Sequence, residues 1–290
     1  MTTASGLLQA TRPRQWIKNA LVLAAPLAAG RILEPEVIIP TLIALVSFIL
    51  ASAATYLIND VRDVASDRAH ETKSRRPIAS GDVSPRVALI TAVVLVVLSL
   101  GLATITGWGL VIVVVSYLVA TFAYSLGLKH EPVIELGLLS AGFLLRAIAG
   151  GVAADLPISP WFLLVTGFGS LSLAAGKRYA ELIDDPEGAA DRRRSLAGYT
   201  PTYLRFVWTM SVAIAVTTYC LWVFEVGQPG STLPWAQLSI IPFVLAVLRY
   251  GVDLDAGRTQ APEDAVLGDR VLLVLGVIWV LIFGAGALGV

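Results

Sequence analysis

The feature that most constrains this chain is a series of long apolar runs separated by short polar stretches. A helix that crosses about 30 Å of hydrocarbon needs roughly 20 mostly apolar residues. Of the 290 residues, 56% are hydrophobic and only 14% are charged, whereas soluble domains carry about 25% charged residues. We therefore predict an all-α polytopic membrane protein, with one transmembrane domain over residues 1–290. Nine spans are expected, near 16–30, 37–58, 86–105, 107–126, 133–153, 160–181, 203–224, 235–251 and 270–289.

The first of these windows is the weakest, because Lys18 and Asn19 lie inside it. Its basic start, short apolar core and small-residue end would also describe a signal peptide. Elsewhere the lone Cys220 excludes disulfides within the chain and metal sites built from cysteines. The formal net charge of zero argues against a nucleic-acid partner.

The distribution of basic residues predicts how the chain is oriented. All Lys and Arg residues except Arg31 and Arg146 fall at the N-terminus or in loops on one side of the expected spans. The positive-inside rule places that side and the N-terminus in the cytoplasm, and the C-terminus outside the inner (plasma) membrane. The two long polar loops, about 59–85 and 182–202, lie on the same side, and we expect them to cap an active-site cavity.

Carboxylates gather directly after the second expected span. On a continuing helix Asn59, Asp63 and Asp67 are spaced by four residues and Asp60 precedes Asp63 by three, so that one stripe carries them all. Carboxylates at this spacing repel one another unless a cation lies among them, and oxygen ligands suit Mg²⁺. These four residues are therefore the metal-ligand candidates, and Asn59, Asp60 and Asp63 are also catalytic candidates. The alternative is a solvated face at the membrane surface, on which neighbouring arginines balance the acids.

Arg146 lies well inside the fifth expected span, where an arginine costs at least ~2.5–3.5 kcal/mol on insertion scales. It must face the bundle interior or a polar cavity, which makes it a candidate for function. Glu135 shares its helix face, but about 16 Å of helix separates the two, too far for a direct pair. A structural partner elsewhere in the bundle is the alternative.

Other cations on the cytoplasmic side are candidates for binding phosphate groups. Near the N-terminus, α-helical spacing would put Arg14 and Lys18 on one face and Gln15 and Asn19 on another. Lys177 and Arg178 lie at the end of the sixth expected span. Their alternative role is an ion pair with Glu181 on the same helix. In the loop after residue 70, the alternative is a topogenic cluster that meets lipid headgroups. The substrate-binding candidates are Lys18, Arg75, Lys129, Arg146, Lys177, Arg178 and Tyr124; Lys18 is also a catalytic candidate, and Lys73 and Arg76 are secondary.

Nine expected spans with Asn59-Asp60-x-x-Asp63-x-x-x-Asp67 after the second one resemble the UbiA superfamily of intramembrane prenyltransferases. The resemblance covers nearly the whole chain. It implies that the motif binds Mg²⁺ and a diphosphate leaving group. Most members carry a second acidic motif in the sixth span, where this chain reads Lys177-Arg178-Tyr179-Ala180-Glu181, so an ordinary prenyl diphosphate substrate is in doubt.

The basic segments 12–19 and 176–179 resemble one branch of that superfamily, whose members transfer 5-phosphoribosyl from phosphoribosyl diphosphate to decaprenyl phosphate. The resemblance implies a pentosyltransferase of cell-wall biogenesis, making precursors of arabinan and arabinogalactan. The chemistry agrees, because three phosphate-bearing groups meeting in one site need more cations than a prenyl diphosphate meeting a neutral aromatic. We expect an apolar groove between helices to hold the polyprenyl (decaprenyl) tail; a homo-oligomer is possible.

Two other functions remain open at this stage. A prenyltransferase that moves a prenyl chain from its diphosphate to an aromatic acceptor would share the Mg²⁺ site without needing Lys177 and Arg178. A secondary transporter would explain the intramembrane Arg146 and two similar halves. Transporters, however, typically interrupt their helices at mid-membrane, whereas the polar clusters of this chain gather at one face.

Overall fold

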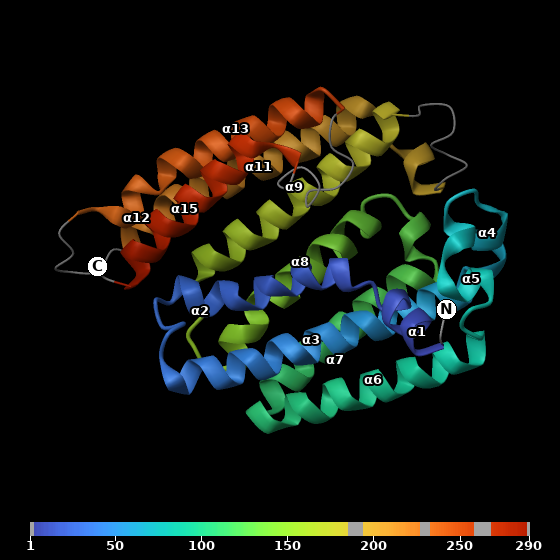
Figure 1. Ribbon diagram of the computed structural model, residues 1–290. Coiled ribbons are helices and arrows are strands. Elements are labelled where there is room, and N and C mark those ends of the chain that lie inside the picture. The colour runs from blue at the N-terminus through green and yellow to red at the C-terminus, as the bar shows by residue number, and fades with distance from the viewer. Residues whose placement is uncertain (1–2, 185–193, 227–232, 258–267, 289–290) are drawn as a thin grey trace. The chain divides into compact units, whose positions relative to one another are not determined.

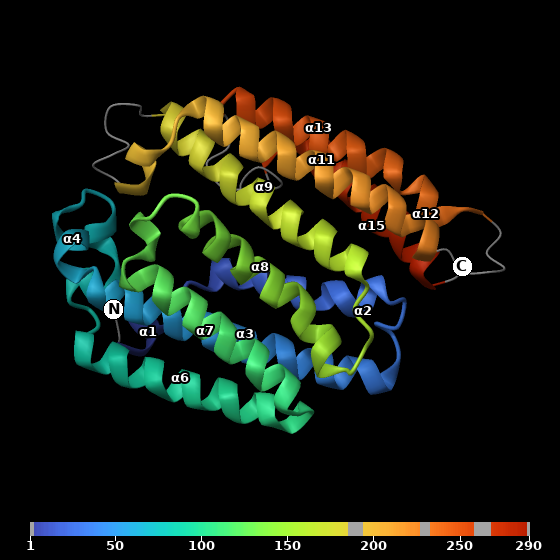
Figure 2. The same cartoon turned by 180° about the vertical axis from the view of Figure 1, so that it is seen from behind.

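The computed structural model describes residues 3–184, 194–226, 233–257 and 268–288, and every regular element within these ranges is a helix (Figures 1 and 2). Seven of the described helices are long and apolar enough to cross a membrane. The expected all-helical, polytopic architecture is thereby confirmed. These seven are Pro35–Arg62, Pro85–Thr106, Trp108–Leu126, Ile134–Ala153, Pro201–Glu225, Trp235–Asp255 and Arg270–Leu288.

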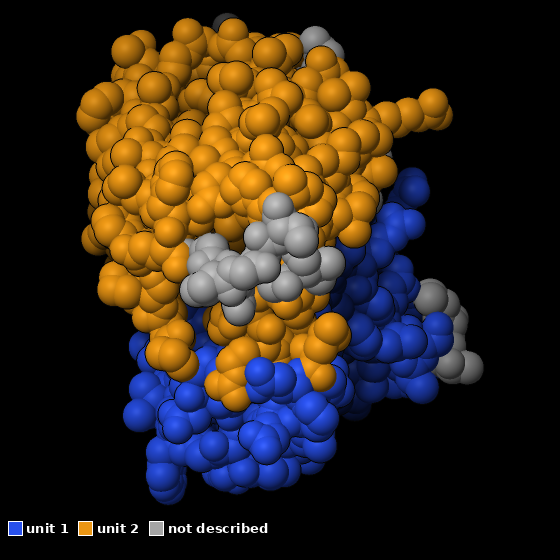
Figure 3. Space-filling view, turned by 90° about the vertical axis from the view of Figure 1, so that its left-hand side faces the viewer, with its two compact units in different colours: residues 1–24, 34–125, 145–156 blue, residues 25–33, 126–144, 157–290 orange. Residues whose placement is uncertain are grey.

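The helices group into two compact units (Figure 3). Unit 1 comprises residues 1–24, 34–125 and 145–156, and unit 2 comprises 25–33, 126–144 and 157–290. The elements of unit 1 are α1 (Thr3–Ala10), η1 (Pro13–Leu23), α3 (Pro35–Arg62), α4 (Val64–Ala69), η2 (Lys73–Arg75), α5 (Pro77–Ser80), α6 (Pro85–Thr106), most of α7 (Trp108–Leu126) and the end of α8 (Ile134–Ala153). Those of unit 2 are most of α2 (Ala24–Ala28), η3 (Leu128–His130), the start of α8, α9 (Pro160–Asp184), η4 (Arg194–Gly198), α11 (Pro201–Val226), α12 (Trp235–Leu238), α13 (Ile240–Asp255) and α15 (Arg270–Leu288).

Unit 1 is organised around the close pairing of α3 with α6, which run side by side in Figures 1 and 2. Small side chains such as Ala51 and Ala92 are buried in this unit, and the Ser99 hydroxyl donates a hydrogen bond of 2.7 Å to the Ser47 carbonyl. Small residues let helix backbones approach closely where lipid removes the hydrophobic drive for packing. Large side chains such as Ile90 and Val97 are exposed, as expected for helices that face lipid.

Unit 2 is built on the pairing of α9 with α11, with α12, α13 and α15 packed in the same unit. An aromatic cluster surrounds Tyr219, whose hydroxyl lies 2.5 Å from the Ser239 hydroxyl and accepts a hydrogen bond of 2.7 Å from the Trp279 indole. Gly30 fits beside α15 because a Cβ there would lie 2.0 Å from the Ala287 carbonyl oxygen. Its φ of +68° also favours glycine.

The single helix expected over 16–30 is wrong. The segment forms the 3₁₀ helix η1 followed by the short α2, and the two buried residues of η1, Asn19 and Val22, are spaced by three. The shared faces expected for Arg14 with Lys18 and for Gln15 with Asn19 are wrong for the same reason. Asn19, inside this segment, is buried and contacts Ser52 and Arg146.

Two further spans differ in detail from the expectation. The window 160–181 forms one continuous helix, α9, but it is not among the seven apolar ones because its C-terminal end is charged. The window 235–251 comprises α12 and α13, which meet at Ser239. The loop expected over 59–85 is largely helical, with α4, η2 and α5 inside it. Of the loop expected over 182–202, residues 185–193 lie outside the described ranges.

Candidate active site

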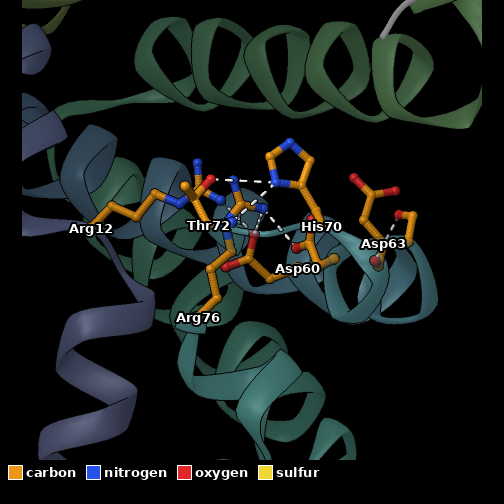
Figure 4. A network of polar contacts seen from close by, with 8 residues as sticks. Arg12, Asp60, Asp63, His70, Thr72 and Arg76 are labelled. Carbon is orange, nitrogen blue, oxygen red and sulfur yellow. Dashed lines mark hydrogen bonds and ion pairs between the residues drawn. The ribbon is translucent and has the colours of Figure 1, made fainter. Parts of the chain in front are cut away.

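Two buried carboxylates and two arginines meet at the end of α3 (Figure 4). Asp60 and Asp67 are each 3% exposed. Arg76 Nη1 lies 2.7 Å from Asp67 Oδ2 and 3.3 Å from Asp60 Oδ1, so one guanidinium bridges both acids. Arg12 Nη2 lies 2.5 Å from Asp60 Oδ1. The repulsion expected between neighbouring carboxylates is therefore relieved by arginines.

A break in the helix decides which acids come together. α3 ends at Arg62, Asp63 adopts φ −90° and ψ 8°, and α4 starts at Val64. As a result Asp60 and Asp67, seven residues apart, share a guanidinium. The half-buried Asp63 lies apart from Asp60 in Figure 4. The continuous stripe expected for Asn59, Asp63 and Asp67 is replaced by this arrangement. Among the described residues, no three Asp, Glu, His or Cys side chains gather as a ready metal cage.

The short helices after α4 place Arg76. Arg68 Nε donates a hydrogen bond of 3.0 Å to the Ala79 carbonyl, which ties α4 to α5. Arg76 precedes Pro77, the buried first residue of α5, so its backbone is fixed next to the core. Lys73 and Arg75, which were expected to help bind phosphate, are exposed on η2. Of the three candidate cations Lys73, Arg75 and Arg76, the structure brings Arg76 to the carboxylates.

Arg146 lies in a second polar cluster of unit 1 and is 7% exposed. Its Nε donates a hydrogen bond of 2.9 Å to Asn19 Oδ1, and its Nη2 donates one of 2.7 Å to the Tyr117 hydroxyl. Asn19 Nδ2 in turn lies 3.2 Å from the Ser52 hydroxyl. The expectation that Arg146 faces the interior is confirmed, and its contacts join η1, α3, α7 and α8. Lys18, the neighbour of Asn19 on η1, is half-buried.

Unit 2 carries a buried ion-pair cluster on α8 and α9. Arg178, 1% exposed, places its Nε 3.0 and 3.1 Å from the two carboxylate oxygens of Glu135, and its Nη1 2.5 Å from Glu181 Oε2. The expected alternative, an ion pair with Glu181, is therefore present, and Glu135 is a second partner that the spacing did not reveal. With both carboxylates in place, Arg178 braces α9 against α8. Lys177 is half-buried and has contacts of its own.

The loop before α8 is tied to the loop before α11. The backbone N–H of Val133 donates a hydrogen bond of 2.6 Å to the Tyr199 hydroxyl, and Pro132 lies where a Cβ at Gly198 would be. Burial raises the pKa of Tyr199 to about 12, so its hydroxyl stays neutral while it accepts this hydrogen bond. Lys129, in η3 of this loop, is half-buried. Tyr124, near the end of α7 in unit 1, is half-buried as well.

Unit 2 also holds a mostly apolar groove of about 540 Å³ between α11 and α13, with Tyr179 of α9 at one end. That end is polar, because Arg205 Nη2 lies 2.5 Å from Asp255 Oδ1 and the Tyr179 hydroxyl. Leu248 and Val252, on the open side of the groove, are exposed. An apolar groove with one charged end matches the chemistry of an amphiphile.

The comparison with known proteins decides the family, because residues 20–267 match the UbiA prenyltransferase family. This chain belongs to that family. A relative from Mycobacterium tuberculosis, a decaprenyl-phosphate phosphoribosyltransferase, is 50% identical over 285 residues, which cover 97% of this chain and 94% of the relative. A protein of the same name from Corynebacterium glutamicum is 49% identical over 282 residues, 96% of this chain and 85% of the relative.

Solved structures of the UbiA family share the fold of this chain. A UbiA homologue from Archaeoglobus fulgidus bound to DMAPP and Mg²⁺ superposes with a TM-score of 0.73 at 17% identity, covering 98% of this chain and 99% of that chain. A digeranylgeranylglyceryl phosphate synthase structure gives 0.73 at 20% identity over the whole of both chains. The expected UbiA family and its all-helical membrane fold are thus confirmed.

The donor atoms of unit 1 fit Mg²⁺. This ion is held by one or two carboxylates together with substrate phosphates, rather than by a complete protein cage. Asp60 and Asp67 supply two carboxylates that face one shared cation. Asn59 and Asp63 remain candidate ligands, because both are half-buried and both lie close to Asp60 in the sequence.

Sequence reasoning missed Arg12 and Tyr117, which were not candidates, and it ranked Arg76 only as a secondary candidate. Arg12 stood in the quoted basic segment, but nothing there links it to Asp60, 48 residues away. Tyr117 looked like an ordinary aromatic of an apolar span. A polar tip on a buried aromatic is a weak signal, because tyrosines are common in such helices.

Proposed function

We propose that this member of the UbiA family transfers a 5-phosphoribosyl group from phosphoribosyl diphosphate to decaprenyl phosphate and releases diphosphate. The observation that carries the proposal is the identity of about 50% with decaprenyl-phosphate phosphoribosyltransferases over nearly the whole chain. The acidic pair and the surrounding cations support it, because both substrates are anionic. We therefore also propose that the chain is a pentosyltransferase of cell-wall precursor synthesis.

In this proposal Asp60 and Asp67 hold Mg²⁺, with Asn59 and Asp63 as further candidate ligands. When bound, the ion supplies charge neutralisation for the departing diphosphate. Arg76 stays beside the two carboxylates and faces the same leaving group. As the bond from C1 to the diphosphate oxygen breaks, the guanidinium stabilises the negative charge that develops. A phosphate oxygen of the lipid attacks the opposite face of C1, so the protein needs to supply no nucleophile.

The remaining cations have distinct proposed roles. Lys18, Arg75, Lys129 and Lys177 are the candidates to contact the phosphates, since they are exposed or half-buried. Arg146 and Arg178, which hold buried partners, act by fixing η1 and α9. Tyr124 stays a candidate for substrate binding, and the groove between α11 and α13 is a candidate for part of the polyprenyl tail.

The proposed setting is the inner membrane, with the N-terminus and the acidic pair on the cytoplasmic side and the C-terminus outside. Nine spans would follow if the segment of η1 and α2, together with α9, also lies in the membrane. The charge of phosphoribosyl diphosphate keeps it out of the bilayer core, so its site has to face water, on the cytoplasmic side in this proposal.

The test is a product assay on the purified chain in detergent. Labelled phosphoribosyl diphosphate with decaprenyl phosphate and Mg²⁺ should give a labelled lipid whose mass equals decaprenyl phosphate plus a phosphoribosyl group. In parallel, a prenyl diphosphate is offered with 4-hydroxybenzoate. Formation of the prenylated aromatic without the ribosylated lipid would overturn the proposal in favour of an ordinary prenyltransferase.

A further inference from the structure

The acidic pair of unit 1 is already neutralised by guanidinium groups. We propose that Arg12 and a divalent metal ion compete for Asp60, and that Arg12 passes from this carboxylate to a phosphate group of the donor substrate when the metal binds. This inference rests on the proposed function. It gives Arg12 a role in positioning the substrate and in setting the metal affinity of the free protein.

Burial explains why Asp60 needs a partner in the absence of metal. A carboxylate that is 3% exposed loses most of its hydration, and a buried charge without a counter-ion is strongly destabilising. Two carboxylates, Asp60 and Asp67, meet two guanidinium groups, Arg12 and Arg76, so the cluster is neutral. A divalent ion carries the same charge as the two guanidinium groups together. Because Arg76 stays, the two carboxylates then face the ion and one guanidinium, which leaves one net positive charge at the cluster. The exchange therefore keeps the carboxylates neutralised and adds positive charge, including the freed Arg12, beside an incoming diphosphate.

The contacts indicate that Arg12, rather than Arg76, is the group that leaves. Arg76 bridges both carboxylates, whereas Arg12 pairs with Asp60 alone (Figure 4). The side chain of Arg12 is 32% exposed and lies over the Tyr56 ring, 4.9 Å from its centroid. Arg76 is 29% exposed, so the number of carboxylates that each arginine holds, rather than exposure, distinguishes the two. The Tyr56 ring is a second contact that Arg12 makes besides Asp60.

The backbone at Arg12 supports a segment with two positions. Arg12 lies between α1 and η1 with φ 56° and ψ 66°, in the left-handed region that costs a non-glycine residue about 1–2 kcal/mol. Such strain persists only when the surroundings hold it, and here the ion pair with Asp60 is one of the restraints. Loss of that ion pair would remove this restraint on the backbone of Arg12.

The experiment measures metal binding and substrate affinity separately in Arg12→Gln. Without substrate, Mn²⁺ binding to the purified protein is followed by the electron paramagnetic resonance signal of the free ion. Removing the competitor should tighten Mn²⁺ binding about two- to fivefold, the range that a partly exposed ion pair supplies. The KM for phosphoribosyl diphosphate should rise about tenfold or more, because a hydrogen bond to a charged phosphate is lost.

Arg86→Gln is the control, since Arg86 is an exposed cation at the start of α6 with no assigned role in binding. Both quantities should stay at the wild-type values in that variant. Arg12→Lys, which keeps the charge but loses the planar fork, should give intermediate values and guards against misfolding of the Gln variant.

Unchanged or weaker Mn²⁺ binding in Arg12→Gln would overturn the competition, and an unchanged KM would overturn the transfer to phosphate. Failure of the proposed function looks different. In that case the wild-type protein itself shows no metal-dependent phosphoribosyl transfer, whatever Arg12 does.

Discussion

Individual polar side chains hold the buried charge of Arg146 inside unit 1. Arg146 is held by Asn19 and Tyr117, and each of these partners would otherwise be a polar group in an apolar surrounding. The sequence alone predicted that Arg146 turns inward, because an intramembrane charge has no other stable place. It could not name the partners, since Asn19 is 127 residues away and pairing over such a distance follows from packing.

We expect Arg146→Met to destabilise the protein by about 2–4 kcal/mol, because Asn19 Oδ1 and the Tyr117 hydroxyl lose a donor in a buried site. Thermal unfolding in detergent, followed by the fluorescence of the tryptophans, measures the change. Arg86→Met at the exposed start of α6 serves as the control and should leave the unfolding temperature within a degree or two. Equal stability of the two variants would show that the cluster around Arg146 contributes little.

Helices were predictable where a long apolar run begins just after a proline or glycine. The windows 37–58, 86–105, 133–153 and 270–289 each match a helix of the structure within a few residues. For example, α6 begins at Pro85 after the capping Ser84 and ends before Gly107. Local spacing revealed neither the 3₁₀ winding of η1 nor the partners of its buried Asn19, which lie on other helices.

Gly30 should not tolerate a side chain, because its added Cβ would meet the Ala287 carbonyl and its φ is +68°. We expect Gly30→Ala to lower the unfolding temperature strongly or to prevent folding, at a cost of at least about 1–3 kcal/mol from overpacking. Gly101→Ala is the control, since nothing lies within 4 Å of a Cβ there and Gly101 is inside α6. That change should be neutral or slightly stabilising.

Asp269 caps the start of α15, where its carboxylate accepts hydrogen bonds from the N–H groups of Val271 and Leu272. Arg249 Nε lies 2.5 Å away and lowers the pKa of Asp269 to about 2. Because the folded pKa lies below the ordinary value of about 4, this contribution is present above pH 4 and is lost as pH falls toward 2.

The stability difference between wild type and Asp269→Asn should therefore be constant from pH 5 to 7 and shrink below pH 4. Chemical unfolding at a series of pH values measures it. A difference that grows on acidification would contradict the assigned direction of the pKa shift.

At the scale of the whole molecule, charge placement was the informative signal of the sequence. Zero net charge says little by itself, but the acids after α3 and the basic segments predicted a site for anions and a divalent ion. The structure adds that Asp60 and Asp67, rather than a stripe through Asp63, form the shared pair. The break after Arg62 was invisible, because no proline or glycine marks it.

The most direct test of the central claim is the Mg²⁺ dependence of phosphoribosyl transfer to decaprenyl phosphate in Asp60→Asn, with Asp82→Asn as the control. Asp82 is an exposed carboxylate that contacts Ser80. We predict Mg²⁺-dependent product with wild type and Asp82→Asn, and at least about a hundredfold loss with Asp60→Asn, as for a lost charge-stabilising group. Full activity of Asp60→Asn, or product formation in excess chelator, would contradict the claim.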